Sequence, residues 1–182
     1  MADPAGRTTA QHLLTGSVDR PLADSAERLQ QLAVARGLTV GTAESCTGGL
    51  VGHAITTIPG SSAYYVGGII SYADAIKTGL LDVPPSTIER HGAVSAQTAV
   101  AMAEGARARL ACDLAVAVTG VAGPDGGTEA KPVGLTYIAV AGAAGHSVQR
   151  HAWEGDRGEN QVLSAAAALE MLIIAVTVEE SP

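Results

Sequence analysis

The sequence is poor in aromatic residues: it has no phenylalanine, one tryptophan and four tyrosines among 182 residues. Hydrophobic residues nevertheless make up 47% of the chain. A buried core therefore has to be built from alanine, valine, leucine and isoleucine rather than from aromatic rings. This length is sufficient for one well-buried domain and too short for two comfortable ones.

Cysteines, basic residues and long apolar runs are also scarce. Cys46 and Cys112 are too few for a disulfide framework, which favours a reducing compartment. Eleven Lys and Arg against 18 Asp and Glu give a net charge of −7, so binding to nucleic acid or to an anionic membrane is not expected. The N-terminal sequence lacks the pattern of a signal peptide, and the apolar stretch MLIIAV is far too short to span a membrane. We expect a soluble, cytoplasmic protein.

Helical and strand periodicities alternate along the chain. Residues 1–20 are polar and aperiodic, which predicts a flexible N-terminal tail before a single domain over 21–180. Helical spacing covers 22–36, about 48–58, 73–81, 96–110 and about 162–176, and strands are expected at 38–45, 66–72, 113–120 and, as a hairpin, within 135–155. This order predicts an α/β fold, a three-layer α/β/α sandwich with a mixed, mostly parallel sheet.

Three polar or glycine-bearing segments each follow a predicted strand. They read ESCTGG, YADAIK and TGVAGPDGG, and the chain has 22 glycines in all. Ligands of open α/β sheets bind beyond the carboxyl ends of the strands. If the three strands are adjacent and parallel, the three segments meet in one pocket.

The segment ESCTGG holds three candidate nucleophiles in a row. It is neither a P-loop nor a G-x-S-x-G elbow, but it places a hydroxyl where a strand leads into a helix. Taken alone, this spacing favours a helix cap at Ser45 or Thr47 over a nucleophile. A catalytic Cys46 needs a histidine partner, and His53 lies about two turns along the same helix, so a core cysteine is favoured.

The segment YADAIK places Tyr72 at a strand end and Lys77 on the next helix. Taken alone, the pattern favours an ordinary solvated lysine. The alternative is a catalytic pair in which a neutral amine takes a proton from a serine, with the phenol relaying or orienting. That role requires the pKa of Lys77 to be lowered by burial or by a neighbouring cation.

The segment TGVAGPDGG offers backbone N–H groups together with Thr119 and Asp125 as polar side chains. Glycine loops of this kind are also common as tight turns. The histidines and cysteines show no metal-ligand spacing, so neither a metal nor any other cofactor is expected.

Six stretches occur in one fixed order and together carry a resemblance: TAESCTGG, PGSS, SYADAIK, HGAVS, TGVAGPDGGTEAKPVG and EGDR. In this set the sequence resembles the CinA C-terminal domain family over roughly residues 22–178. The resemblance implies a nicotinamide-nucleotide amidohydrolase, which converts nicotinamide mononucleotide to nicotinate mononucleotide and ammonia in pyridine nucleotide recycling. It also implies a serine nucleophile with tyrosine and lysine partners.

Carried over to this sequence, the resemblance implies Ser45 as the nucleophile and Tyr72 and Lys77 as its partners. Oxyanion donors are expected among the backbone N–H groups from Thr47 to Gly49 or in the TGVAG loop. The phosphate is expected against a glycine loop, with Lys131 or Arg157 as the nearest cation. The residues expected to contact the nucleotide substrate are Thr47, Gly48, Gly49, Thr119, Gly120, Gly123, Asp125, Gly126, Lys131 and Arg157.

The sequence departs from the family pattern at two places. The family usually has Ser-Asn after the tyrosine, where this chain has Ala73-Asp74, and it often has an arginine shortly after GDR, where this chain has residues 158–161 as GENQ. A non-catalytic module that senses nucleotides or binds a partner therefore stays as the alternative function, and a structural partner of another enzyme as a third. A homodimer or larger homo-oligomer is expected because the last helix is apolar nearly all round.

Overall fold

The computed structural model describes residues 19–179. In chain order its elements are α2 (Asp19–Arg36), β1 (Val40–Glu44), α3 (Leu50–Thr57), the 3₁₀ turn η1 (Ser61–Ala63), β2 (Tyr65–Ile70), α4 (Asp74–Leu81), α5 (Pro85–His91), α6 (Ala96–Leu110), β3 (Leu114–Gly120), β4 (Leu135–Gly142), β5 (Gly145–Ala152) and α7 (Arg157–Val178). The predicted tail lies outside the described residues except for its last two, and these already belong to α2.

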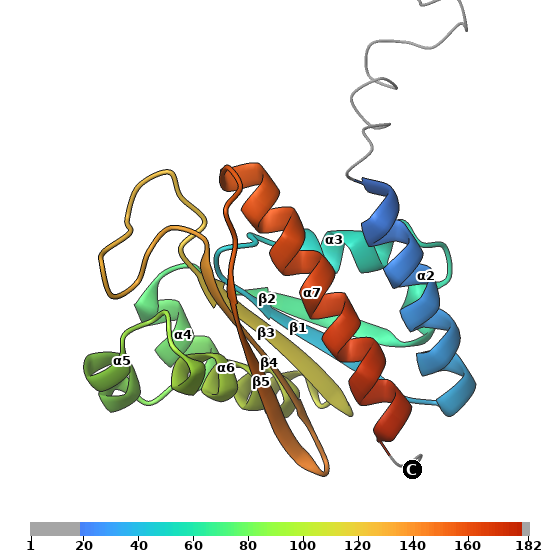
Figure 1. Cartoon of the computed structure of the whole chain (residues 1–182). Coiled ribbons are helices and arrows are strands. Elements are labelled where there is room, and N and C mark those ends of the chain that lie inside the picture. Colours follow the sequence, from blue (N-terminus) through green and yellow to red (C-terminus); the bar gives the residue numbers. More distant parts are fainter. Residues whose placement is uncertain (1–18, 180–182) are drawn as a thin grey trace, which may run out of the picture.

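One mixed sheet forms the middle layer, with the strand order β2-β1-β3-β4-β5. β1 runs parallel to both β2 and β3, whereas β4 and β5 add two antiparallel pairings. Helices α2, α3 and α7 cover one face, and α4, α5 and α6 lie on the other (Figure 1). The predicted three-layer α/β/α fold with a mixed sheet is confirmed.

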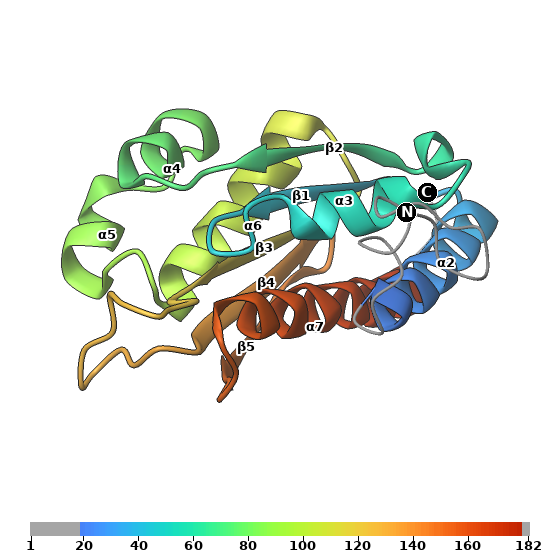
Figure 2. The ribbon, with the colours of Figure 1, turned by 90° about the horizontal axis from the view of Figure 1, so that it is seen from above.

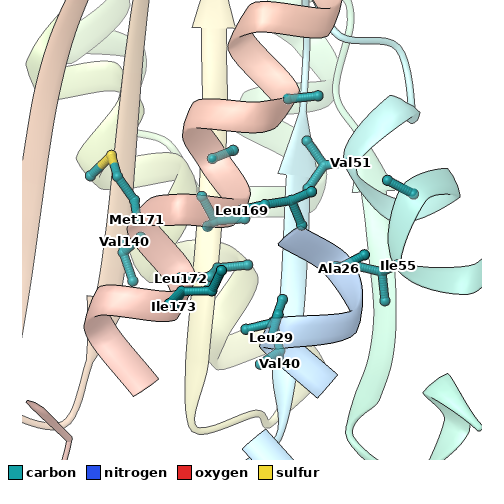
Figure 3. Close-up of a cluster of buried hydrophobic side chains, with 14 of the residues drawn as sticks. Ala26, Leu29, Val40, Val51, Ile55, Val140, Leu169, Met171, Leu172 and Ile173 are labelled. Atoms are coloured by element: carbon teal, nitrogen blue, oxygen red, sulfur yellow. The ribbon is translucent and has the colours of Figure 1, made fainter. Parts of the chain in front are cut away.

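The larger core lies between the sheet and helices α2, α3 and α7. Figure 3 shows Leu29 of α2, Val51 of α3 and Leu169 of α7 converging on strand residues such as Val40. A capping box starts α7: the Asp156 side chain accepts from the Glu159 N–H, and the Glu159 side chain accepts from the Asp156 N–H. α7 is long and apolar enough to span a membrane by length and composition, but it has the position and burial of a core helix.

The second core, on the opposite face, consists mainly of alanine. Ala99, Ala103 and Ala106 of α6 pack against alanines of β1, β3 and β4, so α6 can approach the sheet closely. Gly105 lets α6 approach α4 as well, because a Cβ there would overlap the carbonyl oxygen of Leu81. A protein without phenylalanine thus fills its core with small side chains at short distances between layers.

Most element boundaries agree with the sequence within a few residues, and α5 is the helix that periodicity missed. It has seven residues and begins with Pro85 at its first position. The two predicted strands of 135–155 form the hairpin β4–β5 around a turn at Ala143 and Ala144. Ser95 caps α6 as expected, since its hydroxyl accepts a hydrogen bond from the Thr98 N–H.

Candidate active site

The carboxyl ends of β2, β1 and β3 lie at one edge of the sheet, because these three strands are adjacent and parallel. Figure 2 shows α4, the long loop after β3 and the first turn of α7 at this same end of the molecule. A cavity of about 280 Å³ opens there. Its lining consists of Ser45, Cys46, Tyr72, Asp74, Lys77, Ala93, Val94, Thr119, Gly120, Val121, Ala122, Gly123, Asp125, Gly126 and Arg157.

Ser45 stands directly after β1, where its N–H still donates to the Val118 carbonyl of β3. Its side chain lies at the cavity wall, and the residue is 8% exposed. The Oγ accepts a hydrogen bond of 3.2 Å from Lys77 Nζ. The strand pairing therefore fixes the backbone of Ser45 while its hydroxyl stays beside an amine.

Lys77 is a buried residue, 1% exposed, rather than an ordinary solvated lysine. Its Nζ donates to the carbonyl oxygens of Ser71 at 2.8 Å and Tyr72 at 3.2 Å, in addition to Ser45 Oγ. Burial lowers the pKa of Lys77 from its ordinary value of 10.5, while the Asp74 carboxylate acts in the opposite direction. Neutral amine is therefore more accessible here than on a solvent-exposed lysine.

Cys46 has the environment of an inert core cysteine. Burial raises the pKa of its thiol to about 12, so thiolate is scarce at neutral pH. His53 is exposed on α3 and makes no hydrogen bond to the thiol. Of the two adjacent candidates, only Ser45 has a base within hydrogen-bond distance.

Glu44 occupies the N-terminus of α3, which the sequence had suggested as an anion site. Its carboxylate is 2% exposed and accepts hydrogen bonds from the N–H groups of Gly49, Val51 and Gly52 and from the Thr47 hydroxyl. A second anion is not expected where these donors already hold a buried carboxylate.

Three residues predicted to contact the substrate therefore lie away from the cavity. Thr47, Gly48 and Gly49 form the turn around Glu44 and are absent from the cavity lining. The Gly49 N–H is already used, as is the Gly48 N–H, which donates to the Ser45 carbonyl. The expected oxyanion donors of this turn are thus largely occupied.

The end of β3 and the loop after it do lie in the cavity wall, with five of the predicted contact residues: Thr119, Gly120, Gly123, Asp125 and Gly126. Val121 donates its N–H to the Leu135 carbonyl, which ties the start of the loop to β4. No acceptor is found within residues 19–179 for the N–H groups of Ala122 and Gly123. This loop is the better source of backbone donors for a ligand.

The two predicted cations differ in position. Arg157, the first residue of α7, lines the cavity and donates from Nη1 to the Gly123 carbonyl at 2.7 Å. Lys131 lies outside the lining, because its Nζ donates to the His91 carbonyl at 2.6 Å and packs against Gly92. Of the pair, only Arg157 remains a candidate for the phosphate.

Tyr72 is 62% exposed at the cavity mouth. Its hydroxyl lies 3.3 Å from Arg157 Nη2, and no hydrogen bond joins it to Ser45 or Lys77. The contact with Lys77 runs through the backbone carbonyl of Tyr72 instead. A direct phenolic relay is therefore not part of this arrangement.

Several residues that support the site were missed from the sequence. Gln161 donates from Nε2 to the Cys46 carbonyl at 2.8 Å, and Asn160 donates to the Ala122 carbonyl at 3.0 Å. Both lie in the stretch where the sequence departs from the family pattern. Asp74 lines the cavity beside Lys77. In the part of the chain that the structure describes, no group of three His, Cys, Asp or Glu residues could hold a metal ion.

Residues 22–176 match the family model of the CinA C-terminal domain. The chain belongs to this family. A CinA-like protein from Geotalea uraniireducens is 52% identical over 136 residues, which cover 75% of this chain and 32% of the relative. A CinA-like protein from Parasynechococcus marenigrum is 49% identical over 168 residues, which cover 91% of this chain and 39% of the relative. The chain thus spans about a third of the length of these curated relatives.

Solved structures of CinA-type proteins share the fold. The competence/damage inducible protein CihA from Agrobacterium tumefaciens is 42% identical with a TM-score of 0.83, covering 86% of this chain and 96% of that one. The competence damage-inducible protein A from Klebsiella pneumoniae is 29% identical with a TM-score of 0.84, and the match covers 87% of this chain and 99% of that one. These names state no substrate.

Proposed function

We propose that this CinA-type domain hydrolyses the carboxamide of nicotinamide mononucleotide, with Ser45 as the nucleophile and Lys77 as the general base. The observation that carries the proposal is the contact of Lys77 Nζ with Ser45 Oγ inside a cavity at the carboxyl ends of parallel strands. Family membership supports the substrate, because the resemblance to this family is what implies it. The products are nicotinate mononucleotide and ammonia.

The contacts of Lys77 Nζ also suit the neutral amine that forms once Lys77 has lost a proton. Such an amine has two N–H bonds and one lone pair. The carbonyls of Ser71 and Tyr72 accept the two N–H bonds, which leaves the lone pair for the hydroxyl proton of Ser45. The backbone thereby orients the amine, just as a third group orients the base in other nucleophile–base pairs.

The reaction then follows acyl transfer. Ser45 Oγ bonds to the carboxamide carbon while its proton moves to Lys77, and the carbonyl oxygen becomes an oxyanion. The N–H groups of Ala122 and Gly123 are the proposed oxyanion donors. Lys77 returns the proton to the nitrogen as the C–N bond breaks and ammonia leaves. Water, deprotonated by Lys77, next attacks the nicotinoyl ester, and Ser45 regains its proton.

Substrate charge fits this cavity in two ways. The pyridinium ring is a cation, so its presence near Lys77 disfavours the ammonium form and helps to generate the base. Arg157 is the proposed partner of the phosphate, since a guanidinium binds phosphate oxygens through two parallel N–H bonds. A cytoplasmic location fits this nucleotide substrate and two free cysteines, Cys46 and Cys112.

We also propose a homodimer or larger assembly, but not because α7 is apolar nearly all round. Most of the apolar surface of α7 is covered within the domain by α2, α3 and the sheet. Leu163, Ile174 and Val178 remain exposed on α7. Light scattering at micromolar concentration tests the assembly: a stable monomer would remove it.

Ammonia release from nicotinamide mononucleotide by the purified protein tests the function. Ser45→Ala should abolish release and still fold, because the Ser45 hydroxyl makes a single hydrogen bond, to Lys77, and a bond of this kind contributes only about 0.5–3 kcal/mol. Cys46→Ala is the matched control, one residue away, and should keep most of the activity. Binding of the nucleotide without ammonia release by the unmodified protein would favour the non-catalytic module instead.

A further inference from the structure

Asp74 places a negative charge beside the buried amine of the site. It is the first residue of α4, and its Oδ1 lies 3.8 Å from Lys77 Nζ, one helical turn further on. The Asp74 side chain is 58% exposed, whereas that of Lys77 is 1% exposed, and both residues line the cavity. The carboxylate is therefore the more accessible of the two charged groups to a ligand in the cavity.

We propose that Asp74 is a positioning residue that holds Lys77 in its charged form in the free protein and releases it when a cationic ligand competes for the carboxylate. The kinetic side of this inference rests on the proposed function, but the charge state of Lys77 can be measured without any turnover. Asp74 thereby acts through Lys77 and forms no bond to the reacting atoms.

The contacts of Nζ show why this single carboxylate matters. A charged ammonium has three N–H bonds, and the three acceptors are neutral: Ser45 Oγ and the carbonyls of Ser71 and Tyr72. Within residues 19–179, Asp74 is the only acidic side chain in ion-pair distance of Lys77. At 3.8 Å it acts through its charge rather than through a strong hydrogen bond.

The other titratable groups of the cavity lining form no ion pair with Lys77. The Cys46 thiol, on the turn after β1, has a pKa of about 12 and stays protonated near neutral pH. The Tyr72 hydroxyl at the end of β2 contacts Arg157 of α7. Asp125, on the loop after β3, lines the cavity without an ion pair to Lys77.

The Glu44 carboxylate is turned into the start of α3, away from the cavity lining. Lys77 is therefore subject to two opposed influences. Burial lowers its pKa and Asp74 raises it. A pyridinium ring entering beside Asp74 would pair with the carboxylate and remove the influence that keeps the proton on the amine.

Asp74→Asn tests the inference, with Asp82→Asn as the matched control. Asp82 ends the same helix, its carboxylate pairs with Arg109 outside the cavity, and its φ of 53° suits asparagine. Both variants change the net charge by the same amount. The side-chain ¹⁵N resonance of Lys77 is titrated by NMR in each protein, and assignment is simple because Lys131 is the only other lysine.

In Asp74→Asn the Lys77 titration should move to lower pH, and in Asp82→Asn it should stay in place. We express kcat/KM of each protein as a fraction of its own high-pH plateau. At pH values below the titration of Lys77, this fraction should be roughly three- to tenfold higher in Asp74→Asn than in the unmodified protein. An unchanged Lys77 titration in Asp74→Asn, or an equal shift in Asp82→Asn, overturns the inference. If no protein releases ammonia, the proposed function fails while the titration still decides the role of Asp74.

Discussion

The two segments ESCTGG and TGVAGPDGG at the carboxyl end of the sheet both carry glycines but have different uses. In the turn after β1, the N–H groups of Gly49, Val51 and Gly52 all donate to the buried Glu44 carboxylate. In the loop after β3, no residue of the described chain accepts from the N–H groups of Ala122 and Gly123, and the loop lines the cavity. The first turn is internally satisfied, and the second is open to a ligand.

This difference shows that glycine content alone does not identify an anion site. An acidic residue at the end of the preceding strand can fill the helix N-terminus from within the protein. The turn after β1 then serves to hold Ser45 rigidly, and ligand binding passes to the other loop. Nucleophile and binding donors are thus supplied by separate segments.

After Ser45, the largest effect is expected at Lys77, because its amine contacts the Ser45 hydroxyl. Lys77→Ala should lower kcat/KM by roughly 10²–10⁴-fold. Lys77→Arg should fail as badly, because a guanidinium does not give up its proton in this range. If Lys77 were only a fixed cation, arginine would restore part of the rate.

The pH dependence follows from the direction of the Lys77 shift. Only the neutral amine accepts the Ser45 proton, so kcat/KM should rise with pH as Lys77 of the free protein deprotonates. Since burial lowers its pKa, this rise should be complete at lower pH than for an ordinary lysine. A flat profile would contradict the base role and leave the nucleophile assignment untouched.

Glu44 should contribute to the stability of the fold, whereas Asp125 in the loop after β3 should not. Glu44→Ala leaves four donors without an acceptor, two of them in buried contacts and two in partly buried ones, and a buried donor left unsatisfied costs about 1–3 kcal/mol. We expect the free energy of unfolding to fall by about 3 kcal/mol or more in urea titrations. Asp125→Asn, at an exposed residue of the open loop, should change it by less than about 0.5 kcal/mol. An equal decrease in the free energy of unfolding in both variants would contradict the difference drawn between the two turns.

Arg157 should affect binding more than chemistry. Arg157→Ala removes the hydrogen bond to the Gly123 carbonyl and the proposed phosphate contact, so KM should rise roughly 10- to 100-fold with a smaller change in kcat. Arg150→Ala, at an exposed position of β5, removes the same charge and should leave KM unchanged. A loss confined to kcat would place Arg157 in the chemical step.

The smallest effect is expected for Tyr72→Phe. The hydroxyl contacts Arg157, and the carbonyl that holds Lys77 is retained in phenylalanine. Steady-state kinetics should show a loss of a few-fold at most, because the hydrogen bond that is lost is long, at 3.3 Å, and exposed. A loss as large as that of Lys77→Ala would restore the phenol to the proton path.

The fold could be predicted from the sequence because helices and strands are indicated by local patterns of residues. The continuous apolar run of β3 predicts a strand buried on both faces, and Ser95 is a side-chain cap for the helix that follows it. α5 was missed because seven residues starting at a proline show too little periodicity. The convergence of three strand ends was predicted only on the condition that the strands are adjacent and parallel, and the order β2-β1-β3 with two parallel pairings meets that condition.

The details of the site depend on contacts that no local pattern contains. Tyr72 meets Arg157 across 85 positions of sequence, and Gln161 meets Cys46 across 115. Glu44 looks like the polar end of a strand until its carboxylate is seen to accept four hydrogen bonds. Lys131 resembled a phosphate ligand by its position in a glycine loop, but its Nζ is held by the His91 carbonyl.

The central claim, that Ser45 is acylated during turnover, is tested most directly by trapping the intermediate. The protein is mixed with nicotinamide mononucleotide, quenched in acid within the first turnover, digested and analysed by mass spectrometry. The account predicts a nicotinoyl-nucleotide ester on the peptide that contains Ser45, with the group assigned to Ser45 by fragmentation and absent from Ser45→Ala. A thioester on Cys46, or steady ammonia release with no acyl group on any residue at any quench time, would contradict it.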